Sequence, residues 1–211
     1  MKEHQNFSYN DLLEQHNALL KDARYRTNVE LLQNIIKMHP KNDDLYWIAI
    51  KVSIVDTMLS THLSQYSSIL SLHDISKIIL DLHVDNSIEQ GDSTIVEEIA
   101  KQCKNFKGAG MGINLFSFAS KYCSNHNIHV YGKDDFSIYD STMERHLYLY
   151  ATERNPLNEK DPWRWKKEIN YSRFNEYIGD LLDERGIIES TCPNRRLMFD
   201  QFVWNSNRKS K

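Results

Sequence analysis

Turn-forming residues are scarce in this sequence. Its 211 residues include seven glycines and four prolines, which is few for a chain of this length. Sheets built from many short strands need frequent tight turns, so this scarcity favours long helices. Strand-like alternation of apolar and polar residues is also missing over any useful length in the N-terminal half. The sequence therefore predicts an all-α fold.

Long hydrophobic runs are missing as well. No segment approaches the roughly 18 consecutive apolar residues that a transmembrane helix needs. Residues 1–6 are mostly polar, and we therefore expect neither a signal peptide nor a membrane anchor there. The three cysteines are odd in number and lack the spacing of a metal site, which fits buried or idle thiols in a reducing compartment. We expect an intracellular, cytoplasmic protein with no membrane partner.

The histidines do not form a pattern that predicts a metal site. His62 and His73 are eleven residues apart, and His126 and His129 form an isolated pair in a polar segment. Neither pair is accompanied by Cys or Glu at ligand spacing. We therefore expect packing or surface histidines, and neither a metal ion nor another cofactor.

Positive charge is not in excess, because 26 Lys and Arg stand against 29 Asp and Glu and give a net charge of −3. This balance excludes a protein that coats nucleic acid by bulk electrostatics. A local basic patch on an acidic chain can still bind phosphate.

Apolar residues recur at helical spacing along most of the chain. The helices predicted from this spacing cover residues 9–24, 28–38, 45–59, 72–82, 94–106, 113–122, 140–155, 171–185 and 194–204. The polar segment 124–136 is expected to be a loop, and 156–162 a connector. The prediction is a globular multi-helix domain over residues 1–211, either as a single unit or as two lobes with a cleft between them. Its helical core would cover about 41–155, with the remaining helices drawn from 1–40 and 163–204.

Two helices are predicted to begin at polar capping residues. Asp43 or Asp44 precedes the apolar run that starts at Leu45, and Thr94 is followed three residues later by Glu97, which is the spacing of a capping box.

The two glycines Gly108 and Gly110 lie between two predicted helices, where the chain must reverse within a few residues. Glycine allows the positive φ and the close backbone approach that such a turn demands. One interpretation is a helix C-cap at Gly108 followed by a tight connection. The other is a helix-hairpin-helix, in which the exposed amides of the turn hold a DNA phosphate at the start of the second helix.

Three lysines precede this turn at three-residue steps: Lys101, Lys104 and Lys107. This spacing allows all three side chains to face one phosphate backbone, although a solvated helix face would have the same pattern. We take Lys104, Lys107, Gly108, Gly110 and Gly112 as the candidate DNA-binding residues.

The segment from Phe106 to Asp140 resembles the helix-hairpin-helix DNA glycosylase superfamily. That superfamily has a hairpin of the form hydrophobic-x-Gly-hydrophobic-Gly, then an apolar helix, a loop and an essential Asp. The corresponding parts here are Phe106-x-Gly108-Ala109-Gly110, residues 113–122, and the approach Phe136-Ser137-Ile138-Tyr139 to Asp140. The helix that ends near Ser60-Thr61-His62 is also similar to one that lines the base-side cleft in that family.

This resemblance implies that Asp140 is the catalytic acid. A target nucleotide would be flipped out of the duplex, and the carboxylate would stabilise the cationic sugar or activate the attacking water. A carboxylate suits both tasks because the transition state is similar to an oxocarbenium ion. From the residues alone, Asp140 is better explained as a helix N-terminal carboxylate, since Ser141 and Glu144 have the form of a capping box.

The sequence departs from the family in two ways. The loop before Asp140 is longer than in most members, and Gly112 occupies the position at which bifunctional members carry a nucleophilic Lys. Lys121 lies nine residues beyond Gly112, which places it on the opposite helix face and roughly 13 Å away along the axis. We therefore expect a monofunctional glycosylase rather than a lyase.

Aromatic residues near the candidate site suggest a pocket for the flipped base. Trp163 and Trp165 alternate with Arg164, and Tyr139 directly precedes Asp140. Aromatic rings beside basic groups can stack with unstacked bases, although such clusters also pack connectors against a core.

The function expected from these observations is a DNA glycosylase-like hydrolase that removes a modified or damaged base from duplex DNA. Such a protein would associate with the nucleoid. One alternative is a non-catalytic DNA-binding helix-hairpin-helix protein, which is indicated by Gly112 at the position of the nucleophilic Lys. The other is a helical protein-interaction domain in which the glycines and Asp140 are only caps.

Overall fold

The computed structural model describes residues 5–104 and 114–207, and the regular structure in these residues is helical. The α-helices are α1 (Tyr9–Lys21), α2 (Ala23–Met38), α3 (Leu45–Leu59), α4 (Leu72–Asp81), α5 (Asp85–Gln90), α6 (Thr94–Lys104), α7 (Phe116–His126), α8 (Ser141–His146), α9 (Asp161–Glu168), α10 (Tyr171–Glu184) and α11 (Arg195–Ser206). The short helices are η1 (Leu63–Tyr66), η3 (Asn127–Tyr131) and η4 (Leu147–Tyr150). The prediction of a globular multi-helix protein is confirmed, whereas the predicted hairpin at Gly108 and Gly110 lies outside the described residues.

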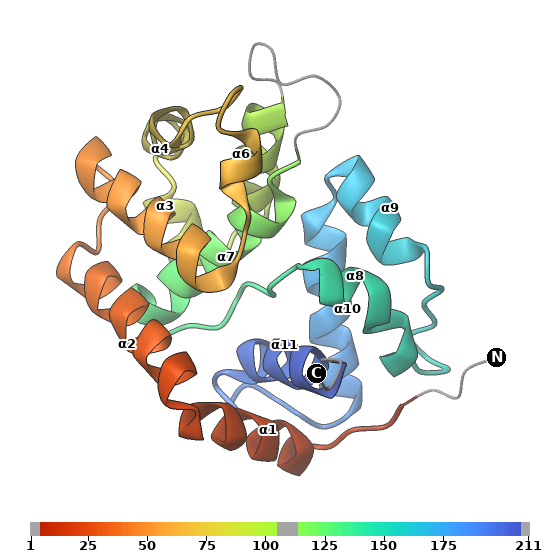
Figure 1. Ribbon diagram of the computed structural model, residues 1–211. Helices are drawn as coiled ribbons and strands as arrows, with labels where there is room; N and C mark the ends of the chain where they lie inside the picture. The colour runs from red at the N-terminus through yellow and green to blue at the C-terminus, as the bar shows by residue number, and fades with distance from the viewer. Residues whose placement is uncertain (1–4, 105–113, 208–211) are drawn as a thin grey trace.

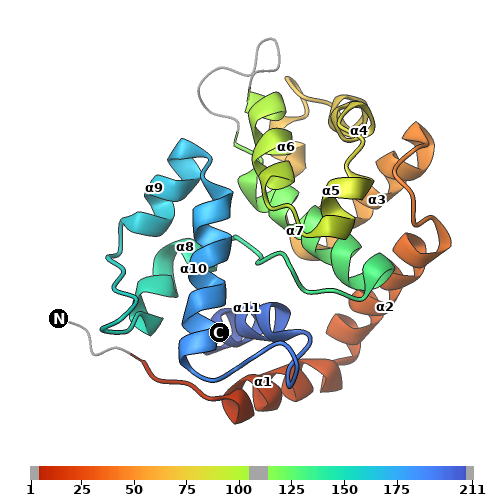
Figure 2. The ribbon, with the colours of Figure 1, turned by 180° about the vertical axis from the view of Figure 1, so that it is seen from behind.

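The helices form two groups around one continuous core (Figures 1 and 2). Helices α2, α3, α4, α6 and α7 pack against one another in the first group. Helices α8 to α11 form the second group, in which α8 contacts both α9 and α11. Helix α1 packs on α11 and so brings the two ends of the chain together. Buried hydrophobic residues from Phe7 to Val203 belong to a single core cluster. The division of the chain into two lobes stays a prediction.

Aspartate side chains begin several of the helices. Asp44 accepts hydrogen bonds from the Tyr46 and Trp47 amides at the start of α3, which confirms the predicted cap there. The capping box predicted for Thr94 and Glu97 is wrong. Asp92 instead accepts from the Thr94 amide, and Glu97 accepts from the amide of Ser172 on α10.

The predicted loop at 124–136 is also wrong over its first half. Helix α7 continues to His126, and η3, a π-helix, extends the turn to Tyr131. Two of the polar side chains in this stretch, those of His126 and Asn127, are buried and hydrogen-bonded. The His126 ring lies 2.7 Å from the Pro40 carbonyl, and Asn127 donates to the Ile88 carbonyl. Because these tertiary bonds compensate for the loss of water, a polar sequence can occupy a buried helix.

Within the described residues, no helix has both the length and the apolar character needed to cross a lipid bilayer.

Candidate functional site: Asp140, Lys121 and Asp200

Asp140 is the N-cap of α8. Its Oδ1 accepts hydrogen bonds from the Thr142 amide at 2.7 Å and from the Met143 amide at 2.9 Å. Asp140 is therefore a helix N-terminal carboxylate, as one interpretation of the sequence predicted. The capping side chain is that of Asp140, whereas the predicted capping box began at Ser141. Its second oxygen, Oδ2, makes no hydrogen bond with any described residue, and the side chain is half-buried. One oxygen thus caps the helix, and the other is free of protein hydrogen bonds among the described residues.

Lys121 lies on α7 and is buried, with 8% of its surface exposed. Its ammonium donates a hydrogen bond of 2.8 Å to the Leu59 carbonyl at the end of α3, next to the Ser60–His62 segment. This is its one hydrogen bond with the described part of the chain. Since an ammonium has three donors, two remain without a described protein acceptor.

A second buried lysine, Lys51, shows what a purely structural lysine is like in the same protein. It is 1% exposed, and its ammonium donates to three protein oxygens, namely the carbonyls of His39 and Lys41 and the Oδ1 of Asn42. All three donors are used, and the result is a fixed connection between α2 and α3. Lys121 differs because its ammonium donates to a single described protein oxygen.

Asp200 on α11 is the third ionisable group at this place. Burial raises the pKa of its carboxyl well above the usual range, the nearby charges of Asp140 and Asp134 raise it further, and Lys121 opposes them. The side chain is half-buried and makes no hydrogen bond or ion pair with the described residues. The charges of Lys121 on α7 and of Asp140 at the start of α8 therefore both act on the carboxyl of Asp200 on α11.

Sequence reasoning missed Asp200 entirely. Sixty residues separate it from Asp140, and it lies on a helix that pattern analysis recognises only by its apolar residues. The available signal was that Asp200 follows Phe199 and precedes Phe202 and Val203, all three of which are buried. An acid among core residues is unusual enough to single out.

The aromatic residues expected to contact a base are placed in different environments. Tyr139 is completely buried, and its hydroxyl donates to the Pro162 carbonyl at 2.9 Å and contacts Glu144 at 3.1 Å. A base would reach this ring only if the packing opened. Trp165 is partly buried and packs against Tyr177. Trp163 is 50% exposed, with the ammonium of Lys167 5.0 Å from its ring centre, and is therefore the accessible member of the group.

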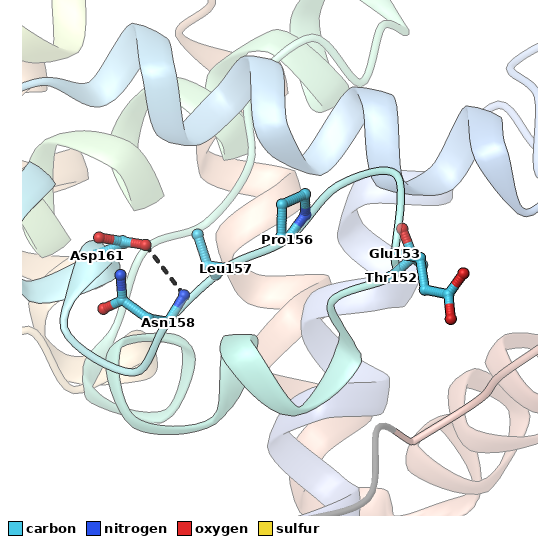
Figure 3. A pocket seen from close by; sticks show the side chains of 6 residues that line it. All are labelled: Thr152, Glu153, Pro156, Leu157, Asn158 and Asp161. Carbon is cyan, nitrogen blue, oxygen red and sulfur yellow. Dashed lines mark hydrogen bonds between the residues drawn. The ribbon is translucent and has the colours of Figure 1, made fainter. Parts of the chain in front are cut away.

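Two surface depressions lie near α8 and α9, but neither is lined by Lys121, Asp140 or Asp200. The larger has a volume of about 500 Å³ and is shown in Figure 3; its lining residues are Thr152, Glu153, Pro156, Leu157, Asn158 and Asp161. The smaller, of about 280 Å³, is lined by Trp163 together with Glu144, Arg145, Tyr148, Glu159 and Lys160.

The expected DNA-binding residues are only partly described. Lys107, Gly108, Gly110 and Gly112 lie outside the described residues. Lys104 is exposed at the last position of α6. Lys101, one turn earlier, pairs with Glu97 at 3.4 Å.

Over the described residues, no group of three or more His, Cys, Asp or Glu side chains is arranged to hold a metal ion. All three cysteines are free and buried, and burial raises the pKa of the Cys103 thiol to about 12. Thiols of this kind stay protonated and unreactive near neutral pH.

Comparison with known proteins relates the chain to a protein of Haemophilus influenzae that bears the name "Uncharacterized protein". The two are 30% identical over 116 residues, which cover 54% of this chain and 51% of the relative. The chain thus spans about half the length of the curated relative it matches. No solved structure matches the chain.

A family model described as the N-terminal domain HI_0787_N matches residues 8–133. The matched segment includes Lys121 and stops before Asp134, Asp140 and Asp200. Because this segment covers more than half of the sequence, the chain belongs to the HI_0787_N family.

Proposed function

We propose that this protein is a helix-hairpin-helix DNA glycosylase that hydrolyses the N-glycosidic bond of a modified or damaged base. The observation that supports this function best is the state of the Asp140 carboxylate. Its Oδ1 is occupied by the α8 amides, its Oδ2 has no partner among the described residues, and its charge raises the pKa of the Asp200 carboxyl. The resemblance of residues 106–140 to the glycosylase superfamily is the second support.

In this mechanism the target nucleotide leaves the base stack and enters the space beside Asp140. As the bond between C1′ and the base nitrogen breaks, positive charge develops on the sugar. The negative charge of Asp140 stabilises that cation, and its free oxygen accepts a proton from the attacking water. The two α8 amides fix the carboxylate in place, so little reorganisation is needed during the reaction.

The proposed partner is duplex DNA that carries a modified base, and the proposed location is the cytoplasm at the nucleoid. In this proposal the exposed Lys104 at the end of α6 contributes a phosphate contact. Binding that depends on phosphate contacts weakens as salt concentration rises.

The test is release of bases from duplex oligonucleotides that carry a panel of modified bases. Wild-type protein is expected to release at least one base, and Asp140→Asn to abolish release while salt-sensitive DNA binding survives. Asn keeps the α8 cap, since it accepts from backbone amides as well as Asp does. DNA binding without any base release would favour the non-catalytic DNA-binding protein, and no DNA binding at all would favour the interaction domain.

Lys121 supports a second candidate, in which the same protein also acts as a lyase. A buried lysine with unused donors is a possible nucleophile once its amine is neutral. The deprotonated amine nitrogen would bond to C1′ as the bond between C1′ and the base nitrogen breaks, and the electron pair of that bond would leave with the base. Sodium borohydride would then trap a covalent protein–DNA product with wild-type protein and with Lys77→Gln, an exposed-lysine control, but not with Lys121→Gln. Base release without any trapped product would leave the monofunctional hydrolase.

A further inference from the structure

We propose that the smaller depression, between α8 and α9, binds an unpaired nucleotide whose base stacks on Trp163 and whose phosphate contacts Arg145 and Lys160. The two helices pack against each other, and the depression is lined by residues of both and of the segment that leads into α9. The site does not depend on the proposed glycosylase function, because neither Asp140 nor Lys121 lines it.

Two aromatic side chains line this depression, which has a volume of about 280 Å³. Trp163 is 50% exposed, and Tyr148 is partly buried against the core. A large ring that stays in solvent at the wall of a depression is a stacking surface for a flat ligand, and every nucleobase has a π face. The volume lies just below the roughly 300 to 1,000 Å³ of small-ligand sites, so the depression fits one nucleotide unit.

The cations around the Trp163 ring keep their charge. Arg145 and Lys160 line the depression, and the Lys167 ammonium lies 5.0 Å from the ring centre of Trp163. The Arg145 guanidinium donates to the carbonyl and the hydroxyl of Ser141, which are neutral acceptors. Lys160 and Lys167 are exposed and form no ion pair with the described residues. All three positive charges are therefore available to an anion.

The acids in the lining offset this charge only in part. They are Glu144 and Glu159. The Glu144 carboxylate lies 2.8 Å from the ammonium of Lys166, which neutralises it. Glu159 is then the one lining acid without an ion pair among the described residues, against the three cations. An aromatic surface with excess positive charge favours a flat anion and disfavours a cation, which is the selectivity that a nucleotide needs.

Helix α9 is fixed to its neighbours, so the stacking surface exists before a ligand binds. The carbonyl of Pro162, next to Trp163, accepts a hydrogen bond of 2.9 Å from the buried Tyr139 hydroxyl. Trp165 is partly buried and packs against Tyr177 on α10, whereas Trp163 stays in solvent. A platform that is already ordered loses little conformational freedom on binding.

The experiment measures binding of a fluorescein-labelled oligothymidylate of about ten nucleotides by fluorescence anisotropy. Trp163→Ala should weaken binding by about 5-fold to 150-fold, the usual effect of losing one stacked base, and Trp163→Tyr should restore most of it. Arg145→Gln and Lys160→Gln should each reduce the slope of log affinity against log salt by about 0.7. The control is Tyr46→Ala on α3, where an aromatic side chain is 66% exposed, and it should bind as wild type does.

A strand of the same length made of abasic sugars separates stacking from charge. Because it has no bases, Trp163→Ala should leave its affinity unchanged. Competition with thymidine monophosphate identifies the source of the nucleotide. If the monophosphate displaces the strand at a similar concentration, the ligand is a free nucleotide; if the strand binds many times more tightly, the ligand is a single strand. Either result supports the site.

Stacking on Trp163 is overturned if Trp163→Ala binds oligothymidylate like wild type, or loses as much affinity for the abasic strand. Equal losses in Tyr46→Ala would also overturn it. If wild-type protein binds neither the strand nor the monophosphate, the whole site is overturned. Circular dichroism confirms that each variant is folded. Base release from duplex DNA depends on Asp140 and is measured separately, so the failure of one proposal is distinct from the failure of the other.

Discussion

At the residue scale, the two oxygens of Asp140 have different surroundings. Capping uses only Oδ1, so substitutions can remove the negative charge without removing the cap. Asp44 likewise accepts hydrogen bonds from the amides two and three residues after it, at the start of α3. It therefore provides a matched cap that is distant from Asp140 in the sequence. The pair makes it possible to measure capping and chemistry separately.

We expect Asp140→Ala and Asp44→Ala each to lower the free energy of unfolding by about 1 kcal/mol, since each loses an N-cap. Asp140→Asn should be close to wild type in stability. Urea unfolding followed by circular dichroism measures all three. Base release should persist in Asp44→Ala and disappear in both Asp140 variants. A large loss of release in Asp44→Ala would mean that the rate reports stability and not the carboxylate.

At the element scale, the junction of α2, α3 and α7 depends on a buried polar network. Asn42 is its centre: it donates to Asp85, its Oδ1 accepts from Lys51 and from the Tyr122 hydroxyl, and its amide lies 3.0 Å from the His126 ring. Burial, followed by the charge of Lys51, lowers the pKa of His126 to about 4. The network therefore holds a neutral histidine, and it fixes the helix that carries Lys121.

This histidine predicts a pH dependence of stability. The folded-state pKa of about 4 lies below the ordinary value of 6.5, so the unfolded chain binds the proton more tightly. The stabilisation present above pH 6.5 is therefore lost as pH falls toward 4, by about 3 kcal/mol. Urea unfolding of wild type and His126→Gln at several pH values isolates this contribution as their difference.

The control for this measurement is His73→Gln. The His73 side chain is 65% exposed, so its replacement should leave the dependence on pH as in wild type. Equal slopes for wild type and His126→Gln between pH 4 and 6.5 would contradict the buried neutral histidine.

At the scale of the whole molecule, the N-terminal segment closes the fold by packing on the C-terminal helix. Phe7 is 5% exposed and packs against three aromatic rings. The distance from its ring centre to the ring centre of Phe199 is 5.0 Å, to that of Phe202 5.5 Å and to that of Tyr150 5.9 Å. These contacts hold α11, and with it Asp200, against the rest of the protein. The proposed site therefore depends on both ends of the chain.

We expect Phe7→Ala to lower the free energy of unfolding by about 3 to 5 kcal/mol, because it leaves a cavity among three aromatic rings. Tyr9→Ala, at a position that is 40% exposed, should change it by about 0.5 kcal/mol or less. Urea unfolding provides both values. Similar effects for the two variants would contradict a closing role for Phe7.

The sequence by itself determined the helical class and most helix positions, because apolar spacing and capping residues act over a few neighbouring positions. Examples are α3 with its Asp44 cap, and α10. Its errors have a common cause. The polar run at 124–131 folds as a buried helix because Pro40 and Ile88, distant in sequence, supply its hydrogen-bond partners.

The site divides in the same way. Asp140 stood out in the sequence through its local pattern, and its cap depends on amides two and three residues away. The action of the Asp140 and Lys121 charges on the Asp200 carboxyl was decided only by the tertiary structure. Helical spacing gives the direction of a side chain around its own helix axis, whereas the packing of α8 against α11 depends on how the core is filled.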